Sequence, residues 1–136
     1  MYNKYNLETE NNFSAETIFS CAFKDDRIFV WYKESYRLVL CCEIAFLEAS
    51  RDYSFIHFRD GKKWLVVHPM KTVLENLPST QFQRISRSYT VNLDCVTRFL
   101  GNMVYIGERA FLISPAYREA VWSCFTFLGS VRGIRK

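Results

Sequence analysis

The stretch MKTVLENLPSTQFQRISRSYTVNL, residues 70–93, contains the most informative change of hydrophobic period in the chain. Its apolar residues first recur at i, i+3, i+4 and i+7, the spacing of one helix face: Met70, Val73, Leu74 and Leu77. Pro69 suits the start of this helix, and Pro78 ends it. Phe82–Ile85 and Tyr89–Leu93 then have the composition of short strands. A helix of about two turns cannot stand alone, so we expect it to pack on strands.

Outward from this stretch, the sequence predicts more strands joined by tight turns. The expected strands are Ile28–Tyr32, Arg37–Cys42, Ile44–Ala49, Ser54–Phe58, Lys63–Val67, Val96–Leu100, Met103–Ile106 and Arg109–Ile113. The pairs Asp60-Gly61 and Gly101-Asn102 indicate hairpins, because glycine accepts the positive φ of the turn. We expect the first two strands to extend the sheet or to cover one of its edge strands.

A C-terminal helix is expected after the last strand. Ser114-Pro115 fits an N-cap followed by the first helical residue. The helical spacing returns in Val121, Cys124, Phe125 and Leu128, and Gly129 suits a C-terminal stop. The sequence therefore predicts a mainly β fold with one short inserted helix and a C-terminal helix. Its core candidates are Leu74, Leu77, Phe82, Ile85 and Val91.

Length and composition indicate one folded domain. The chain has 136 residues, 49% of them hydrophobic, 24% charged and 17% aromatic, and the aromatic share favours β structure. The sequence lacks an apolar run of about 18 residues or more, so we expect no membrane insertion. Residues 1–15 are polar and unlike a secretory signal, and we expect a cytoplasmic protein.

The cysteines point to reduced thiols. There are five of them, an odd number, and no two form a C-x-x-C pair. Cys41 and Cys42 are adjacent in an apolar run. We therefore expect buried, reduced cysteines rather than a disulfide framework or a zinc site.

Charge is unevenly distributed along the chain. Residues 1–45 carry a net charge of −2 and residues 46–136 a net charge of +6. Such asymmetry is compatible with a polyanion-binding domain behind a more acidic arm, although charge alone favours an uneven solvated surface.

Little in the sequence supports catalysis. His57 sits within an alternating strand, on the face opposite Ile56 and Phe58, and His68 lies at a strand–helix junction; we expect structural roles for both. Neither has a cysteine or carboxylate at metal-ligand spacing, and no nucleophile elbow or phosphate-binding glycine loop is present. A small hydrolase with carboxylates distant in sequence stays open as a minor alternative. The prediction is a non-enzyme without metal or cofactor.

Three polar clusters interrupt the strands of the basic region: residues 49–54, 84–89 and 114–118. Each combines arginine with serine or tyrosine. Arginine binds phosphate or the guanine edge with a planar fork, and hydroxyl groups donate to phosphate. If the fold brings the clusters to one edge, they would form a rim suited to duplex DNA.

Residues of these clusters carry a resemblance to the LytTR domain, a bacterial DNA-binding module. Ile44–Ala49 followed by Asp52-Tyr53-Ser54 is similar to the start of that domain. The helix ending in Leu77-Pro78, followed by Phe82–Leu93, resembles the family signature F-x-R-x-H-R-S-Y-x-V-N. Leu112-Ile113-Ser114 with Tyr117-Arg118 is similar to the closing motif. The closest match spans residues 40–122.

The resemblance implies an elongated fold of three small sheets and sequence-specific DNA binding in transcription control. Family members insert loops into successive major grooves, often as two copies on a repeated site. The DNA-contacting residues it implies here are Arg51, Tyr53, Ser54, Ser86, Arg87, Tyr117 and Arg118. Asn92 also lies in the signature, where we expect a structural role at the end of a strand.

The chain departs from the family pattern at two places. Ser86 replaces the usual histidine before Arg-Ser and reaches less far. Pro115 and Ala116 stand where basic residues are common, which leaves Arg118 as the substitute. These departures keep a second hypothesis open: a protein-interaction module that uses Trp31, Tyr32, Trp64 and Trp122 to bind a regulatory partner.

The predicted organisation is an N-terminal arm over residues 1–27, a domain over 28–128 and a basic tail over 129–136. Many family members carry a receiver domain of about 120 residues before the DNA-binding domain. Too few residues precede the match for a receiver, so we expect a stand-alone member or an excised domain.

Overall fold

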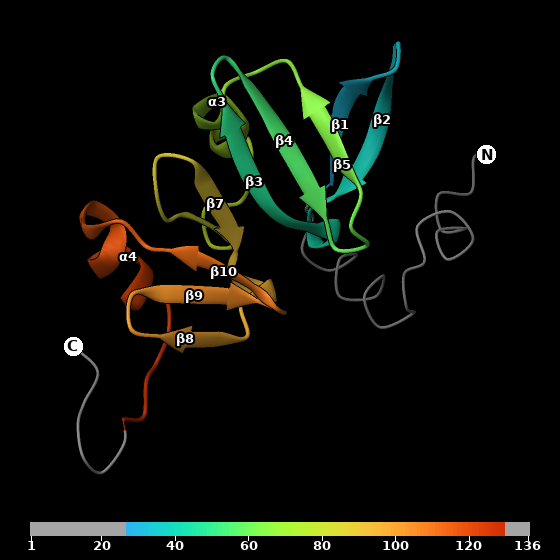
Figure 1. Cartoon of the computed structure of the whole chain (residues 1–136). Helices are drawn as coiled ribbons and strands as arrows, with labels where there is room; N and C mark the ends of the chain where they lie inside the picture. The colour runs from blue at the N-terminus through green and yellow to red at the C-terminus, as the bar shows by residue number, and fades with distance from the viewer. Residues whose placement is uncertain (1–26, 130–136) are drawn as a thin grey trace.

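The computed structural model describes residues 27–129, and within them the fold is mainly β. Ten strands form three antiparallel sheets of two, three and five strands (Figure 1). The strands are β1 (Arg27–Tyr32), β2 (Ser35–Leu40), β3 (Ile44–Ser50), β4 (Tyr53–Phe58), β5 (Lys63–Val66), β6 (Phe82–Arg84), β7 (Tyr89–Asn92), β8 (Arg98–Leu100), β9 (Met103–Ile106) and β10 (Arg109–Leu112). The helices are α3 (Met70–Glu75) and α4 (Arg118–Trp122), with 3-10 turns η1 (Cys41–Glu43), η2 (Leu93–Cys95) and η3 (Pro115–Tyr117). The predicted β-rich fold with an inserted helix is confirmed, while the predicted arm and tail fall outside the described residues except for Arg27 and Gly129.

The five-stranded sheet has the order β5-β4-β3-β7-β6. Consecutive strands β3, β4 and β5 form hairpins, and β7 pairs with the other edge of β3. The predicted hairpin turn at Asp60-Gly61 is confirmed, with Gly61 at a φ of 94°. A side chain at that φ is strained, which explains why glycine occupies the position.

The first two strands form a sheet of their own rather than an extension of the larger one. Their hairpin packs against β5, the edge strand of the five-stranded sheet, where the Tyr32 ring stacks on the Trp64 ring at 4.3 Å between centroids. Val30 and Val39 enter the core from this hairpin. Of the two expectations for these strands, the covering of an edge strand is therefore confirmed.

Two clusters of buried residues hold the sheets together. The first lies under the hairpin, the five-stranded sheet and α3, and it contains Leu47, Ile56, Met70 and Phe82. The second joins the five-stranded sheet to the three-stranded sheet β8–β10 and α4; it contains Ile85, Val91, Val104, Phe111 and Val121. The predicted core residues Leu77, Phe82, Ile85 and Val91 are buried, and Leu74 packs on the first cluster while half-buried.

The predicted C-terminal helix is too long. Helix α4 ends at Trp122, and Leu128, expected on its apolar face, is 95% exposed. The chain instead brings the Phe125 and Phe127 rings against Phe99 of β8, at 5.5 and 5.1 Å between centroids. Edge-to-face packing of large rings outweighs the modest helix propensity of this segment.

The prediction of buried, reduced cysteines is correct at Cys41 and Cys95, correct only in redox state at Cys124, which is exposed, and wrong in redox state at Cys42. Cys41, Cys95 and Cys124 form no disulfide, and Cys41 and Cys95 are buried. Cys42 is disulfide-bonded. It is also buried but belongs to neither core cluster, unlike its neighbour Cys41. Cys41 and Cys42 are thus adjacent in sequence, but their side chains have different surroundings.

No described helix combines the length and apolar character needed to span a bilayer.

Candidate nucleic-acid interface

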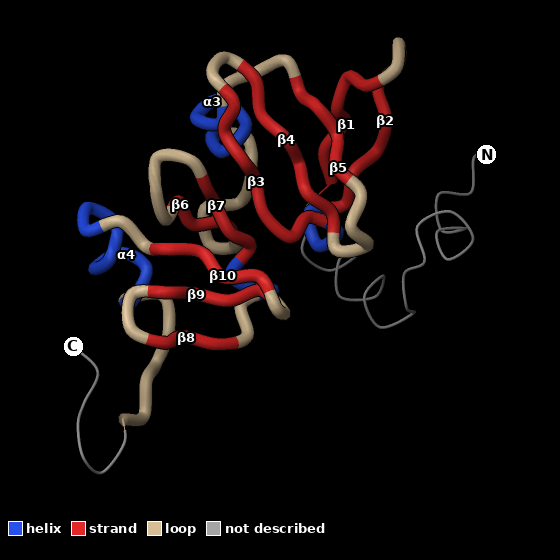
Figure 2. Tube along the Cα trace, in the orientation of Figure 1, coloured by secondary structure: helices blue, strands red, loops and turns tan. Residues whose placement is uncertain are grey.

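The β3–β4 turn and the β6–β7 loop lie side by side at one end of the five-stranded sheet. Strand β3 ends where β7 begins, because the two strands are antiparallel neighbours with Glu48 opposite Tyr89. A backbone hydrogen bond from Ala49 N to Ser88 O, 2.8 Å long, joins the two connections. In the view of Figure 2, the β6–β7 loop lies between the β3–β4 turn at the top and α4 at the lower left.

The third polar segment, residues 114–118, is attached to the same end. Ser114 N donates to Ile85 O at 2.9 Å, so the segment that follows β10 is bonded directly to the β6–β7 loop. The fold thus brings together three segments that are far apart in sequence. We call this set, residues 50–53, 85–88 and 114–118, the recognition edge.

In the first segment, Arg51 and Tyr53 are presented to solvent and Ser54 is not. Arg51 is exposed and adopts a φ of 60°, and Tyr53 is 47% exposed. Ser54 is fully buried, and its hydroxyl donates to His68 O at 2.6 Å. The expectation that Ser54 contacts DNA is therefore corrected. Strand alternation turns its side chain toward the core, where its hydrogen bond joins β4 to His68 in the segment that leads into α3.

In the second segment, Arg87 is exposed while Ser86 shapes the loop. The Ser86 Oγ accepts the N–H groups of Ser88 and Tyr89 at 3.2 and 3.1 Å. Its oxygen is thus engaged within the loop, and only its hydroxyl proton is left for a ligand.

Arg84 is a functional candidate that the sequence analysis placed in the second polar cluster but not among the DNA-contacting residues. Its Nε donates to Ser86 O at 3.0 Å and its Nη2 to Arg87 O at 2.5 Å. The one available signal was its position in the family signature, three residues before Arg87. Sequence pattern alone made it a strand residue of β6.

In the third segment, both predicted residues are half-buried. Tyr117 packs against the second core cluster, and the Arg118 Nε donates to Ile113 O at 3.4 Å. Pro115 and Ala116 are exposed and carry no charge. This segment therefore offers less to a ligand than the other two.

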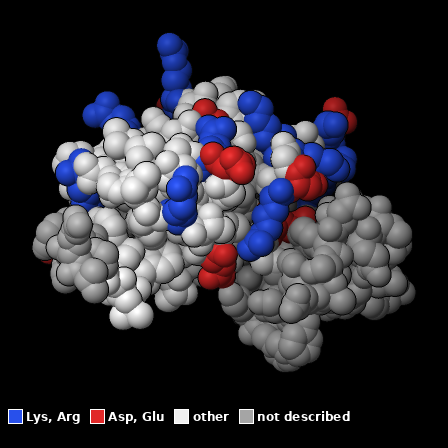
Figure 3. Space-filling model, turned by 60° about the horizontal axis from the view of Figure 1, so that its bottom comes forward, with Lys and Arg blue, Asp and Glu red and all other residues white. Residues whose placement is uncertain are grey.

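The exposed arginines of the recognition edge are electrostatically unmatched. Among the described residues, neither Arg51 nor Arg87 forms an ion pair or a side-chain hydrogen bond. Their guanidinium donors are thus available to phosphate or base edges. On the face drawn in Figure 3, lysine and arginine side chains are scattered rather than joined in one patch.

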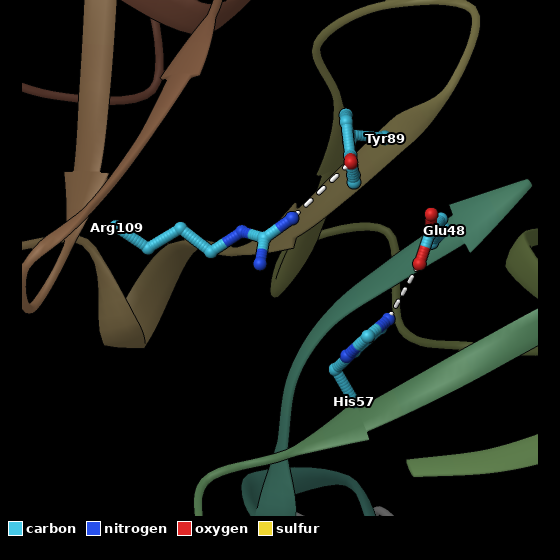
Figure 4. A network of polar contacts seen from close by, with 4 residues as sticks. All are labelled: Glu48, His57, Tyr89 and Arg109. Atoms are coloured by element: carbon cyan, nitrogen blue, oxygen red, sulfur yellow. Dashed lines mark hydrogen bonds and ion pairs between the residues drawn. The ribbon is translucent and has the colours of Figure 1, made fainter. Parts of the chain in front are cut away.

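Beside the recognition edge, one polar contact joins β3 to β4 and a second joins the two larger sheets (Figure 4). His57 Nε2 lies 2.7 Å from Glu48 Oε1, and its ring stacks on Phe46 at 4.1 Å between centroids. Burial lowers the pKa of His57, although the Glu48 carboxylate opposes this shift. The Arg109 guanidinium donates to Tyr89 Oη at 3.2 Å. His57 therefore packs in the sheet, as expected for a structural residue.

Metal-ligating side chains do not gather within the described part of the chain: no group of three or more histidine, cysteine, aspartate or glutamate residues is placed to hold an ion.

A small-sheet β fold that presents arginines from loops at one end has the features of a DNA-binding domain, and comparison with known families agrees. The family model of the LytTr DNA-binding domain matches residues 34–120, which is more than half of the chain. The chain belongs to the LytTr DNA-binding domain family, a family of DNA-binding domains. The family match begins at residue 34, six residues before the start of the match that the motifs alone indicated, residues 40–122.

A solved structure has the same fold. It is the LytTr DNA-binding domain of a protein described as a methyl-accepting/DNA response regulator from Bacillus cereus. The TM-score is 0.64 at 14% sequence identity, and the alignment covers 75% of this chain and 98% of that chain. Among curated proteins, none matches the chain by sequence.

Proposed function

We propose that this chain binds double-stranded DNA sequence-specifically in bacterial transcription regulation, through loops inserted into successive major grooves. The observation that carries the proposal is the assembly of the three polar segments into one recognition edge, by the bonds Ala49 N to Ser88 O and Ser114 N to Ile85 O. Family membership supplies DNA as the partner. The protein would act in the bacterial cytoplasm, where the chromosome is.

The residues of the recognition edge divide by their exposure. Arg51 and Arg87 are the proposed phosphate or guanine contacts, because both are exposed and unpaired among the described residues. Tyr53 adds an exposed ring and hydroxyl. Arg118 and Tyr117 have a lesser part, since each is half-buried and Arg118 already donates to Ile113 O.

The test is a selection from random duplex DNA, followed by titration of the enriched duplex at two salt concentrations. The expected result is a short enriched motif, repeated if two copies bind, with affinity that falls steeply with salt. Affinity of the same order for a scrambled duplex of equal length would refute sequence-specific binding. Lys62→Ala serves as the matched control for Arg87→Ala, because each removes one positive charge and Lys62 is exposed at the opposite end of the same sheet.

A protein-interaction role is the second candidate, and the β1–β2 hairpin favours it. Phe29, Trp31 and Tyr36 are 65%, 50% and 68% exposed there, away from the recognition edge. The other aromatic residues considered for this role, Tyr32, Trp64 and Trp122, are half-buried in ring contacts. This candidate predicts that no duplex is enriched and that the chain self-associates in sedimentation, with Trp31→Ser abolishing the association.

A further inference from the structure

The four-residue loop 85–88 is held by an unusually complete set of hydrogen bonds. All four of its carbonyl groups accept a donor: Ile85 O from Ser114 N, Ser86 O and Arg87 O from the Arg84 side chain, and Ser88 O from Ala49 N. Loops at a protein surface commonly leave such groups to water. The conformation of this loop is therefore restrained by three other parts of the chain, through Ser114, Arg84 and Ala49.

The amide groups of the loop follow the same pattern with one exception. Ile85 N and Ser86 N donate to Tyr89 O at 3.0 and 3.3 Å, and Ser88 N donates to Ser86 Oγ. The Arg87 N–H is the amide of the loop for which the described residues offer no acceptor. The Arg87 side chain is exposed and also unpaired among them. The donors that the loop leaves free are thus gathered on one residue.

Arg84 is the only side chain outside the loop that supplies bonds to two of these carbonyls, as far as the described residues show. A guanidinium group is planar, and its donors have a fixed fork geometry. Bonding to consecutive carbonyl groups with this fork constrains the peptide between Ser86 and Arg87. A lysine at position 84 would keep the charge but could not reproduce the fork.

We propose that Arg84 is a positioning residue of the recognition edge: its guanidinium fixes the Ser86 and Arg87 carbonyl groups so that the Arg87 amide and side chain are presented to the duplex. The inference rests on the proposed DNA-binding function. It assigns Arg84 a role through Arg87, and not as a contact to DNA. A pre-organised loop binds more tightly because it loses less conformational freedom on binding.

The experiment compares the full chain with Arg84→Gln, Arg84→Lys and Arg87→Ala. The probes are the duplex enriched by selection and a scrambled duplex, measured by fluorescence anisotropy between about 50 and 200 mM salt. Both Arg84 variants are expected to lower the affinity for the enriched duplex about tenfold. The slope of log affinity against log salt should stay unchanged for them, and fall by about one for Arg87→Ala.

Amide hydrogen exchange supplies a readout that is independent of DNA. The N–H groups of Ser88 and Tyr89 should exchange faster in both Arg84 variants, because the loop that shields them is released, while amides of β3 and β4 keep their protection. Uniformly faster exchange would indicate general destabilisation and would overturn a positioning role.

Three other outcomes overturn the inference. A salt slope that falls by about one in Arg84→Gln and is restored in Arg84→Lys would make Arg84 a phosphate contact. Wild-type affinity of Arg84→Lys, with loss of binding in Arg87→Ala, would show that the fork is dispensable and would leave the proposed function intact. If no duplex is enriched with the wild-type chain, the proposed function fails, and unchanged exchange at Ser88 and Tyr89 would then refute the restraint of the loop separately.

Discussion

The two ends of the five-stranded sheet are built from similar hairpins. They differ in the hydrogen bonds that join neighbouring connections and in whether their exposed charged side chains are paired. At the recognition edge, backbone groups join neighbouring connections, and Arg51 and Arg87 have no acidic partner among the described residues. At the opposite end, which we call the far end, the backbone bond from Arg59 N to Glu43 O at 2.8 Å is joined by a buried side-chain tie, in which Asn92 Nδ2 donates to Ile44 O at 2.8 Å. Cations and anions are balanced there, with Lys62 Nζ 3.9 Å from Asp60.

The two turns that flank β4 show the same division. The far-end turn places Gly61 at a φ of 94°, which costs glycine little. The turn at the recognition edge places Arg51 at a φ of 60°, a region that costs an L-residue about 1 kcal/mol or more. The comparison teaches that the far-end turn has a residue suited to its backbone conformation, whereas the turn at the recognition edge keeps an unpaired, strained arginine that stability does not require.

The largest effect is expected from removing the tie at the far end. Asn92→Ala should lower the free energy of unfolding by about 3–4 kcal/mol, because the Asn92 side chain also caps η2 through Asp94 N. Ile44 O would keep only the weak Cys95 thiol donor at 3.8 Å. Denaturant titration measures the loss. A change below about 1 kcal/mol would show that the far end does not depend on this residue.

The buried carboxyl of the far end should make stability depend on pH. Glu43 accepts Leu40 N–H at 2.9 Å, and burial raises its pKa from 4.5 to about 7, assisted by Asp60. Because the folded-state pKa is the higher one, the protonated form stabilises the fold, and stability falls as pH rises from about 4.5 through 7. The expected loss over this whole pH range is about 3 kcal/mol.

Glu43→Gln isolates this contribution. The variant should match the wild-type free energy of unfolding near pH 4 and exceed it near pH 8 by about 3 kcal/mol, since the amide stays neutral. Equal slopes of stability against pH in the two proteins would contradict the assignment to Glu43.

At the recognition edge, the expected change is in affinity rather than stability. Arg87→Ala should weaken binding to the enriched duplex by about 1–3 kcal/mol and alter the free energy of unfolding by less than about 0.5 kcal/mol. Lys62→Ala, an equal loss of charge at the far end, should leave binding within about twofold of wild type. Equal losses in both variants would mean that net charge, and not the recognition edge, drives binding.

The smallest effects are expected from substitutions at the two positive-φ residues in the turns that flank β4. Gly61→Ala should destabilise the protein by about 1 kcal/mol, and Arg51→Gly should stabilise it or leave it unchanged. Arg51→Gly should nevertheless weaken DNA binding, because it removes an exposed guanidinium. Thermal unfolding with a parallel anisotropy titration separates the two effects, and a destabilised Arg51→Gly would refute strain at this turn.

Much of the fold followed from local sequence signals. The alternating strands, the Asp60-Gly61 turn and the apolar face that begins at Met70 depend on residues close together in the chain, so the sequence predicted them within one or two residues. The motif Phe82–Leu93 also identified the family. These features are local because turn geometry and side-chain period are set by neighbouring residues.

The functional site was predicted less completely, because its arrangement depends on distant partners. Ser54 is a plausible donor in sequence, yet it faces His68 in the core. Arg84 resembles any strand residue until its fork reaches across the loop. The sequence by itself determined the strands, the short helix and the residues able to bind phosphate. Only the tertiary structure decided which of them reach solvent together, because exposure and hydrogen-bond partners are properties of packed elements and not of the chain order.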